Sequence, residues 1–206
     1  MTAPTVDYFF ATVSPWAYLG HARFVAMAAA AGAVVRIKPM DLGEIFPLSG
    51  GLPLAKRAPQ RQAYRLLELK RFSDWLGIPL IPQPAHFPVS GTESALLIIA
   101  TDLALGSAAA LGLAGRVGAA CWAQQRNLAD AAVLRTLLDE AGLPATLMDQ
   151  AATPEVAARY AGYTQEAKAL GIFGAPSYVI DGEIFWGQDR LDFVGRRLAG
   201  VGPATN

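Results

Sequence analysis

The chain has 206 residues, 53% of them apolar, which is enough for one substantial core or for a compact domain with an inserted lobe. Lys plus Arg equals Asp plus Glu at 17 each, so no overall basic field is present to hold nucleic acid. The single cysteine, Cys121, excludes an intramolecular disulfide, a CxxC pair and a thiolate metal site. Any thiol chemistry must therefore use a thiol from another molecule, and an enzyme for small molecules fits this composition best.

The start of the chain and its apolar runs indicate the cellular compartment in which the protein is expected. Residues 1–7 lack a basic region followed by an apolar stretch, and they lead directly into a strand-like segment. The apolar run at residues 95–100 is far shorter than the ~20 residues that span a bilayer. We expect a cytoplasmic protein with no membrane span.

The first forty residues have the pattern of a β-α-β unit. Residues 6–13 are rich in β-branched and aromatic residues and predict a strand that ends at Ser14 and Pro15. Residues 15–31 contain helix formers with apolar positions at helical spacing. Residues 34–38 predict a second strand.

A long helical stretch follows the second strand. Residues 41–51 show no periodic element and predict a loop, and the prolines of residues 78–89 predict an irregular surface passage. Helical patterns occupy the remainder of this stretch. The predicted helices are residues 60–76, 92–105, 109–125, 130–141 and 153–171.

The end of the chain returns to strand patterns. Residues 177–180 and 183–186 predict two strands joined by Asp181 and Gly182. This pair is a strong hairpin signal, because both central residues of the favoured turn need positive φ. A terminal helix is predicted at residues 190–198.

Ser14 lies where the first strand passes into the first helix. There the first backbone N–H groups lack partners within the helix and the helix dipole favours an anion. Taken alone, Ser14 followed by Pro15 predicts an ordinary N-cap. Pro176, which precedes the hairpin, taken alone predicts the start of an edge strand.

Four segments together resemble a known family. They read DYFF (7–10), SPWAYL (14–19), GIFGAP (171–176) and IFWGQDRL (184–191). They are similar to the 2-hydroxychromene-2-carboxylate isomerase family, which belongs to the DsbA-like branch together with kappa-class glutathione transferases. The resemblance covers nearly the whole chain and implies an α/β fold. It consists of a thioredoxin-like βαβ…ββα domain (1–42 and 172–206) with a large all-helical insertion domain (43–171).

The resemblance implies roles for the two junctions. Ser14 stands where a thioredoxin relative carries its first redox cysteine, and Ala17 stands in place of the second. As the catalytic residue, Ser14 would donate a hydrogen bond to the sulfur of glutathione. Pro176 would follow a cis peptide bond and present the main chain of Ala175 to the cysteinyl unit of glutathione.

The resemblance also implies contacts for the two ends of glutathione. Gln188 and Asp189 would receive the γ-glutamyl end, where a carboxylate suits the α-ammonium group. Asp189 can also stabilise the N-terminus of the last helix. Gly51 stands where the family has an asparagine, which leaves Arg61, or Lys56, to meet the glycine carboxylate. Either cation can equally be a solvated surface charge.

The implied protein is a glutathione-dependent isomerase, a homodimer with a small aromatic carboxylate as substrate. It would interconvert 2-hydroxychromene-2-carboxylate and trans-o-hydroxybenzylidenepyruvate, or a similar aromatic-degradation intermediate, with glutathione as a regenerated cofactor. Trp16, beside Ser14, is the candidate wall of the substrate pocket, although aromatic residues are commonly core. Two alternatives stay open: a kappa-like glutathione transferase that conjugates small electrophiles, and a non-catalytic thioredoxin-fold binding module.

The remaining polar residues favour structural roles. His21 and His86 have no partner at ligand spacing, so no metal site is predicted. Cys121 lies in a helical Ala-Ala-Cys-Trp context typical of a buried packing residue. A cluster of cations around Glu68 predicts a solvated helix face. These cations are Arg57, Arg61, Arg65, Lys70 and Arg71.

Overall fold

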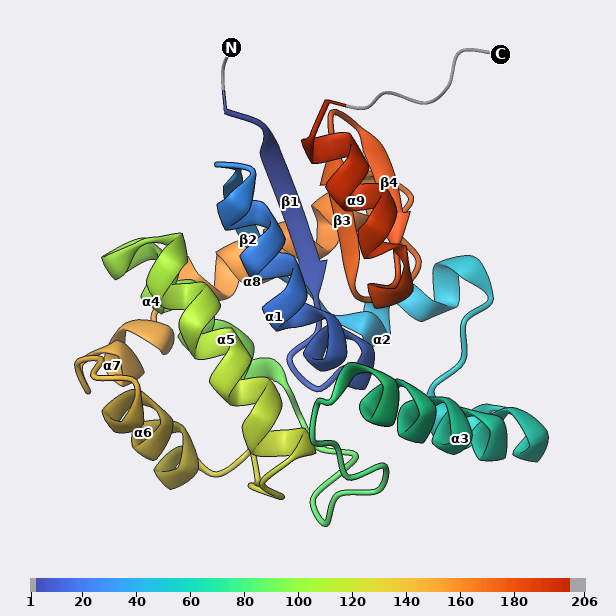
Figure 1. Cartoon of the computed structure of the whole chain (residues 1–206). Helices are drawn as coiled ribbons and strands as arrows, with labels where there is room; N and C mark the ends of the chain where they lie inside the picture. The colour runs from blue at the N-terminus through green and yellow to red at the C-terminus, as the bar shows by residue number, and fades with distance from the viewer. Residues whose placement is uncertain (1–2, 201–206) are drawn as a thin grey trace.

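The computed structural model of the chain describes residues 3–200, and a four-stranded sheet of order β2-β1-β3-β4 lies at its centre (Figure 1). β1 (Thr5–Phe10) pairs in parallel with β2 (Val34–Pro39). On its other side β1 pairs antiparallel with β3 (Ser177–Ile180), and β3 pairs antiparallel with β4 (Glu183–Trp186). Both ends of the chain therefore contribute neighbouring strands to one sheet.

β1 is shorter than predicted. It ends at Phe10, whereas the sequence predicts a strand up to residue 13. Residues 11–13 leave the sheet because the N–H of Ser14 donates a hydrogen bond to the carbonyl of Ala11 over 3.0 Å, which closes a turn. α1 (Pro15–Ala30) begins immediately after this turn and leads to β2, so the predicted β-α-β unit is confirmed.

The predicted hairpin is confirmed at the other end of the chain. Asp181 and Gly182 have φ values of 50° and 82°, and Ile180 pairs with Glu183 across the turn. These positive φ angles are those that the Asp-Gly pair favours. A 3-10 turn, η3 (Gln188–Arg190), then leads into the terminal helix α9 (Leu191–Leu198).

Helices fill the chain between β2 and β3. The predicted loop at residues 41–51 is wrong, because Asp41 caps a single helical turn by accepting a hydrogen bond from the N–H of Gly43 over 2.7 Å. α7 is also missing from the prediction, and at five residues it is too short to show a period. These elements are α2 (Leu42–Ile45), η1 (Phe46–Ser49), η2 (Leu54–Lys56), α3 (Pro59–Leu76), α4 (Thr92–Leu105), α5 (Ser107–Trp122), α6 (Ala131–Glu140), α7 (Leu147–Ala151) and α8 (Pro154–Ala169).

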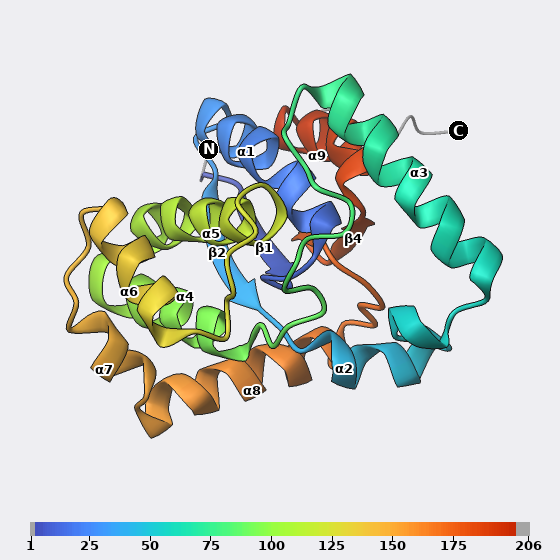
Figure 2. The ribbon, with the colours of Figure 1, turned by 90° about the horizontal axis from the view of Figure 1, so that it is seen from below.

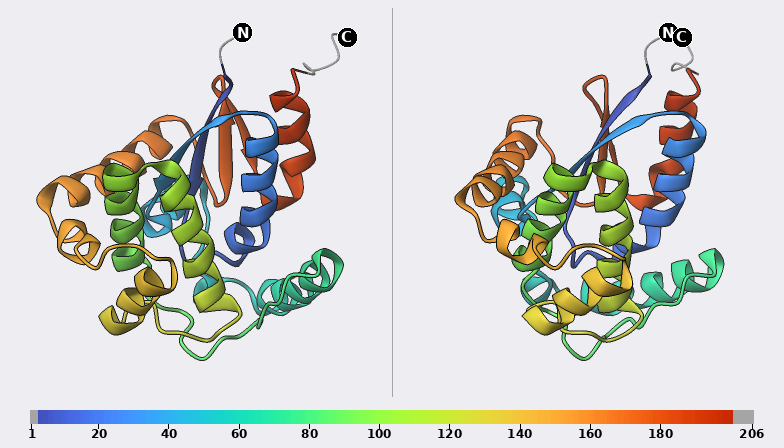
Figure 3. Two further views of the ribbon diagram at one scale, coloured as in Figure 1. Left: turned by 60° about the vertical axis from the view of Figure 1, so that its left-hand side comes forward. Right: turned by 90° about the vertical axis from the view of Figure 1, so that its left-hand side faces the viewer.

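The two faces of the sheet are covered by different helices. α1 and α9 lie on one side and α8 on the other (Figure 3). Tyr8 of β1 belongs to the larger core, together with residues of α1, α4, α5 and α9. Phe9, the next residue, belongs to a smaller core with Ile45 of α2 and Ala167 of α8. Successive residues of a strand point to opposite faces, so β1 contributes to both cores.

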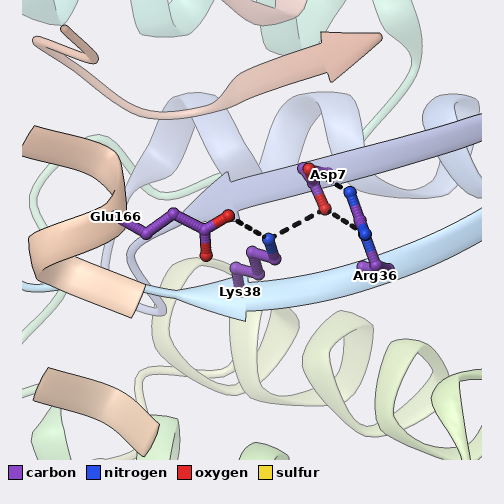
Figure 4. Close-up of polar contacts among 4 residues, drawn as sticks. All are labelled: Asp7, Arg36, Lys38 and Glu166. Atoms are coloured by element: carbon purple, nitrogen blue, oxygen red, sulfur yellow. Dashed lines mark hydrogen bonds and ion pairs between the residues drawn. The ribbon is translucent and has the colours of Figure 1, made fainter. Parts of the chain in front are cut away.

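Ion pairs connect β1, β2 and α8 across the second face (Figure 4). Asp7 pairs with Arg36 and with Lys38, and the Nζ atom of Lys38 lies 3.0 Å from Asp7 and 2.6 Å from Glu166. Asp7 and Lys38 are both buried. This chain of alternating charges attaches α8 to the sheet.

α3 lies apart from the other inserted helices and extends outward from the end of α1 (Figure 2). Among residues 3–200, no helix is both long and apolar enough to cross a membrane. The larger core runs without a break from β1 and α1 into α4 and α5. The division into 1–42 with 172–206 and 43–171 stays a prediction.

Candidate active site

Ser14 caps α1, as its position next to Pro15 predicts. Its φ and ψ angles of −82° and 121° are extended, and its Oγ accepts a hydrogen bond from the N–H of Ala17 over 3.2 Å. The residue is only 6% exposed. Within residues 3–200 nothing accepts a hydrogen bond from the Ser14 hydroxyl. A hydroxyl hydrogen is therefore available at a helix N-terminus, where the helix dipole favours an anion.

The peptide bond between Ala175 and Pro176 is cis, as the family resemblance implies. Phe9 pairs with Ser177 in the antiparallel ladder, which places Pro176 opposite Phe10 and Ala175 beside the turn that leads to Ser14. The carbonyl of Pro176 accepts a hydrogen bond from the N–H of Gly187 over 2.9 Å. The serine turn and the cis proline thus meet at one edge of the sheet.

The main chain of Ala175 is open at this edge. No group within residues 3–200 forms a hydrogen bond with its N–H or its carbonyl. An extended peptide can pair with such a free segment as an added strand. The arrangement is suited to a peptide-like ligand whose backbone lies along Ala175 while another of its groups reaches Ser14.

The one cysteine is remote from this chemistry. Cys121 is buried in α5, and burial raises the pKa of its thiol to about 12. The predicted role as a buried packing residue is confirmed. Ala17, which is also buried, offers no thiol in the first turn of α1. A reactive sulfur at Ser14 must come from a ligand.

Gln188 and Asp189 behave differently in η3. Gln188 is 2% exposed, and its Oε1 accepts a hydrogen bond from Nη1 of Arg23 over 2.9 Å. It also packs closely on α1, since a Cβ at Gly20 would lie 2.7 Å from the Cβ of Gln188. Its side chain therefore connects η3 to α1, and the structure does not direct its carboxamide toward solvent.

Asp189 is the accessible member of this pair. Its side chain is 44% exposed, and its Oδ2 lies 2.7 Å from Nη1 of Arg190. Gly187 has a φ of +105°, and a Cβ at that position would collide with Oδ1 of Asp189. The positive φ angle is what requires glycine here, because the exposed carboxylate of Asp189 could move aside.

Trp16 and Arg61 lie at different distances from Ser14. Trp16 follows it by two residues and packs edge-on against Phe72 of α3, with ring centroids 5.7 Å apart. Arg61 is exposed in the first turn of α3, at the end that lies away from α1 (Figure 2). Arg61 and Phe72 are eleven positions apart, which corresponds to about 16 Å along the helix axis. The structure does not bring Arg61 to the serine turn.

Gly51 has a local reason to lack a side chain. A Cβ at this position would lie 2.9 Å from Cδ1 of Phe46. A larger residue would have to displace that ring, because real Cβ atoms do not approach so closely.

The cationic face of α3 is only partly solvated, which corrects the prediction. The guanidinium of Arg65 is half-buried, 5.4 Å from the ring centroid of Phe87 and 5.6 Å from that of Trp122. Burial, with the charge of Arg57 as a second cause, lowers the pKa of Arg65 to about 10. Arg57 itself lies over the ring of Phe46. The exposed members are Arg61, Lys70 and Arg71. The aromatic partners of Arg65 are distant in sequence, so spacing within α3 could not show this.

A cavity of about 260 Å³, which the sequence did not indicate, lies beside the serine turn. Its walls come from the turn after β1, the turn after β2, the start of α4 and Tyr160 of α8. Two hydroxyls connect the turn after β1 to the start of α4: Thr12 donates to the carbonyl of Gly91 over 3.0 Å, and Ser94 donates to Thr12 over 2.8 Å. Trp16 is not part of the wall. No local pattern joins segments so far apart in sequence.

The histidines take no part in a metal cluster within the described part of the chain. No group of three or more His, Cys, Asp or Glu side chains gathers there. His21 is buried, with Nε2 2.9 Å from the carbonyl of Leu111 and Nδ1 3.3 Å from the hydroxyl of Tyr8. Both ring nitrogens are therefore occupied by structural contacts.

A strand that leads into a helix capped by serine, opposite a cis proline that opens a hairpin, defines a thioredoxin-like site without redox cysteines. The chain belongs to the family of the DSBA-like thioredoxin domain, whose model matches residues 5–199. The α/β thioredoxin-like fold expected from the sequence is confirmed.

Known proteins extend this assignment. The chain is 28% identical to a 2-hydroxychromene-2-carboxylate isomerase of Sphingobium xenophagum over 192 residues, which are 92% of this chain and 95% of the relative. It is 28% identical to glutathione S-transferase kappa 1 of Caenorhabditis elegans over 103 residues, 47% of this chain and 45% of the relative. A solved structure of a 2-hydroxychromene-2-carboxylate isomerase superposes with a TM-score of 0.78 at 22% identity, covering 96% of this chain and 99% of that one. The resemblance that the four sequence segments carry is confirmed.

Proposed function

We propose that this protein is a glutathione-dependent isomerase that interconverts 2-hydroxychromene-2-carboxylate and trans-o-hydroxybenzylidenepyruvate, or a closely similar aromatic-degradation intermediate. The observation that carries the proposal is the buried hydroxyl of Ser14 at the N-terminus of α1, a helix of 16 residues. Within residues 3–200 no group accepts a hydrogen bond from this hydroxyl. The open main chain of Ala175 beside it supports a peptide cofactor. The isomerase relative covers nearly the whole chain and supports the reaction class.

The residues at this edge fit glutathione. Ser14 would donate a hydrogen bond to its sulfur, and the main chain of Ala175, shaped by Pro176, would pair with its cysteinyl unit. The exposed carboxylate of Asp189 would meet the α-ammonium group of the γ-glutamyl end. Gln188 would assist chiefly by holding η3 against α1. The proposed contact of the glycine carboxylate with Arg61 would require α3 and the cofactor to approach each other, because Arg61 does not lie at the serine turn.

Bound glutathione would supply a thiolate that adds reversibly to a conjugated carbon of the substrate and is regenerated when it leaves. Ser14 and the N-terminus of α1 both stabilise negative charge at the sulfur, so they lower the pKa of the bound thiol. A serine cannot form a disulfide with the cofactor. The cofactor is therefore not oxidised at this site, and free thiol is regenerated when the carbon–sulfur bond to the substrate breaks again.

The proposal includes a cytoplasmic homodimer that binds a small aromatic carboxylate. These features follow from the family resemblance, and the mass of the protein in sedimentation equilibrium tests the dimer directly. Trp16 remains the proposed aromatic neighbour of the reacting atoms.

Ser14→Ala tests the proposal. Turnover of 2-hydroxychromene-2-carboxylate with saturating glutathione should fall about 10- to 100-fold, because a hydrogen bond to a charged atom contributes about 1.5–3 kcal/mol. The pKa of the bound thiol, followed by thiolate absorbance, should rise by about 1–2 units. Wild-type protein that neither binds glutathione nor isomerises the substrate would refute the proposal.

A matched control separates chemistry from capping. Asp130 caps α6 by accepting a hydrogen bond from the N–H of Ala132 over 2.8 Å, far from the serine turn in sequence. Asp130→Ala should lose about 1 kcal/mol of stability, as Ser14→Ala also should. Only the serine variant should lose turnover and shift the thiol pKa.

A kappa-like transferase is the second candidate, supported by the match to glutathione S-transferase kappa 1 over about half the chain. It predicts that a stable glutathione conjugate of a small electrophile accumulates, whereas the isomerase regenerates free glutathione. A non-catalytic binding module predicts glutathione or peptide binding beside Pro176 with neither product.

A further inference from the structure

The cavity of about 260 Å³ lies next to the proposed catalytic turn. Ala11, Thr12 and Val13 form one wall, and Val13 directly precedes Ser14. Met40 and Asp41, which follow β2, form a second wall. A group held here is within one residue of the turn that would hold the cofactor sulfur, so the cavity is placed to receive the second reactant.

Most hydrogen-bonding groups of the wall are already used. The hydroxyl of Thr12 donates to Gly91 and accepts from Ser94. The hydroxyl of Ser90 donates to Glu93 over 2.9 Å and accepts from the N–H of Thr92 over 3.2 Å. These contacts hold the wall together and leave little capacity for a ligand.

Asp41 retains capacity. It uses Oδ1 to accept a hydrogen bond from Gly43, and no group within residues 3–200 donates to its Oδ2. The phenol of Tyr160 also lies in the wall, where Thr92 is its hydrogen-bond partner. The remainder of the lining is largely apolar, with Met40, Leu42 and Val89 among its members.

The cavity has an unfavourable field for anions. No Lys, Arg or His lines it. Burial raises the pKa of Tyr160 to about 12, and the negative charge of Asp41 contributes, against the opposing effect of a hydrogen bond with Thr92. Asp41 is the one carboxylate in the wall, since Glu44 and Glu93 lie outside it and Glu44 is paired with Lys168. The charge of Asp41 would repel an anionic group, since juxtaposed like charges are unfavourable.

The size sets a further limit. A cavity of about 150 Å³ is enough to bind benzene. The 260 Å³ available here therefore admits one aromatic ring with a few additional atoms.

We propose that this cavity binds the neutral hydroxyphenyl ring of the open-chain reactant, trans-o-hydroxybenzylidenepyruvate, with the phenol hydroxyl donating a hydrogen bond to Asp41 and the carboxylate at the other end of the molecule held outside. This inference deepens the proposed function by assigning the ring end and the anionic end of the substrate to different places. Asp41 thus acts as a specificity residue that selects a hydrogen-bond donor and excludes an anion.

Direct binding tests the proposal without cofactor or turnover. The full chain labelled with ¹³C at the methionine methyl groups is titrated with phenol and, separately, with benzoate. Phenol should shift the Met40 methyl signal in a saturable way, while the signals of Met27 and Met148, which are not in the wall, stay in place. Benzoate, similar in size but anionic, should bind at least about tenfold more weakly.

Asp41→Asn tests the selecting residue. Asparagine caps helices as well as aspartate does, so α2 should persist. The preference for phenol over benzoate should shrink about tenfold when the charge is removed. Asp130→Asn changes an equivalent helix cap away from the cavity wall and should leave the preference unchanged.

Equal binding of phenol and benzoate by the wild type, or a Met40 signal that phenol does not move, would overturn the inference. Both readouts are independent of glutathione. A failure here therefore leaves the isomerase test intact, and a failure of glutathione binding leaves this one intact.

Discussion

The two faces of the central sheet bury different kinds of polar group. On the face covered by α1, Tyr8 stacks on Tyr178 at 5.3 Å, and its hydroxyl meets the buried His21. On the face covered by α8, Asp7 and Lys38 are buried as charges, each with an oppositely charged partner (Figure 4). Asp7 and Tyr8 are consecutive residues of β1. One strand thus supports a neutral core on one side and an ion-paired core on the other.

The two faces should therefore differ in how much stability is lost when a buried polar group loses its partner. On the ionic face, every charge depends on a partner, because an unpaired buried charge is strongly destabilising. On the neutral face, an unpaired polar group is less costly than an unpaired charge. The hydroxyl of Tyr178, for example, is buried there without a hydrogen bond within residues 3–200. Four measurements test this contrast.

The largest effect is expected at Lys38. Lys38→Met leaves Asp7 with Arg36 alone and Glu166 without its partner on β2. The free energy of unfolding should fall by about 3 kcal/mol in urea titrations. Glu166→Gln is the control, since its side chain is 41% exposed and the loss should stay below about 1 kcal/mol. Equal losses would show that the network is not truly buried.

The neutral face should show itself in the pH dependence of stability. Burial lowers the pKa of His21, against the opposing effect of its bond to Leu111. The unfolded chain takes up the proton near pH 6.5, whereas the folded chain does so only at lower pH. The contribution of His21 to the free energy of unfolding is therefore constant above about pH 6.5. Below that pH it falls by at most ~1.4 kcal/mol per pH unit, until the pKa of His21 in the folded chain is reached.

Urea titrations between about pH 8 and about pH 5 measure this slope, which is the range in which histidine changes charge. His21→Gln removes the titrating group while keeping a donor for Leu111, so its stability should vary less over the same range. An unchanged slope in that variant would assign the pH dependence to other groups.

Tyr8→Phe should have a smaller effect. It removes the hydroxyl that contacts Nδ1 of His21 and leaves that buried nitrogen without a partner. The cost should be about 1–2 kcal/mol in the free energy of unfolding, measured above the pH at which His21 titrates.

Tyr178→Phe should have the smallest effect. The ring stays in the same stack, and the hydroxyl that is lost has no hydrogen bond within the described residues. Removing an unsatisfied buried hydroxyl should change stability by less than about 0.5 kcal/mol or increase it. A loss as large as that of Tyr8→Phe would mean that the Tyr178 hydroxyl has a partner after all.

Much of the site could be predicted because its signals are local. Ser14 next to Pro15 specifies a cap, and Asp181 with Gly182 specifies the hairpin turn, each through interactions within a few residues. The end of β1 could not be predicted this way. Residues 11–13 have strand composition, but the neighbouring strands offer them no partners, because β2 ends at Pro39 and β3 begins only at Ser177.

Sequence alone was sufficient for the β-α-β unit, the hairpin, the cap at Ser14 and the absence of a dithiol, because backbone preferences and residue counts need no distant partner. Only the tertiary structure decided which polar groups are free. Gln188, predicted to face the cofactor, is held by Arg23 at a separation of 165 residues. The cavity beside Val13 likewise requires segments from β1, β2, α4 and α8 to converge. Such contacts depend on packing between distant segments, which no local pattern encodes.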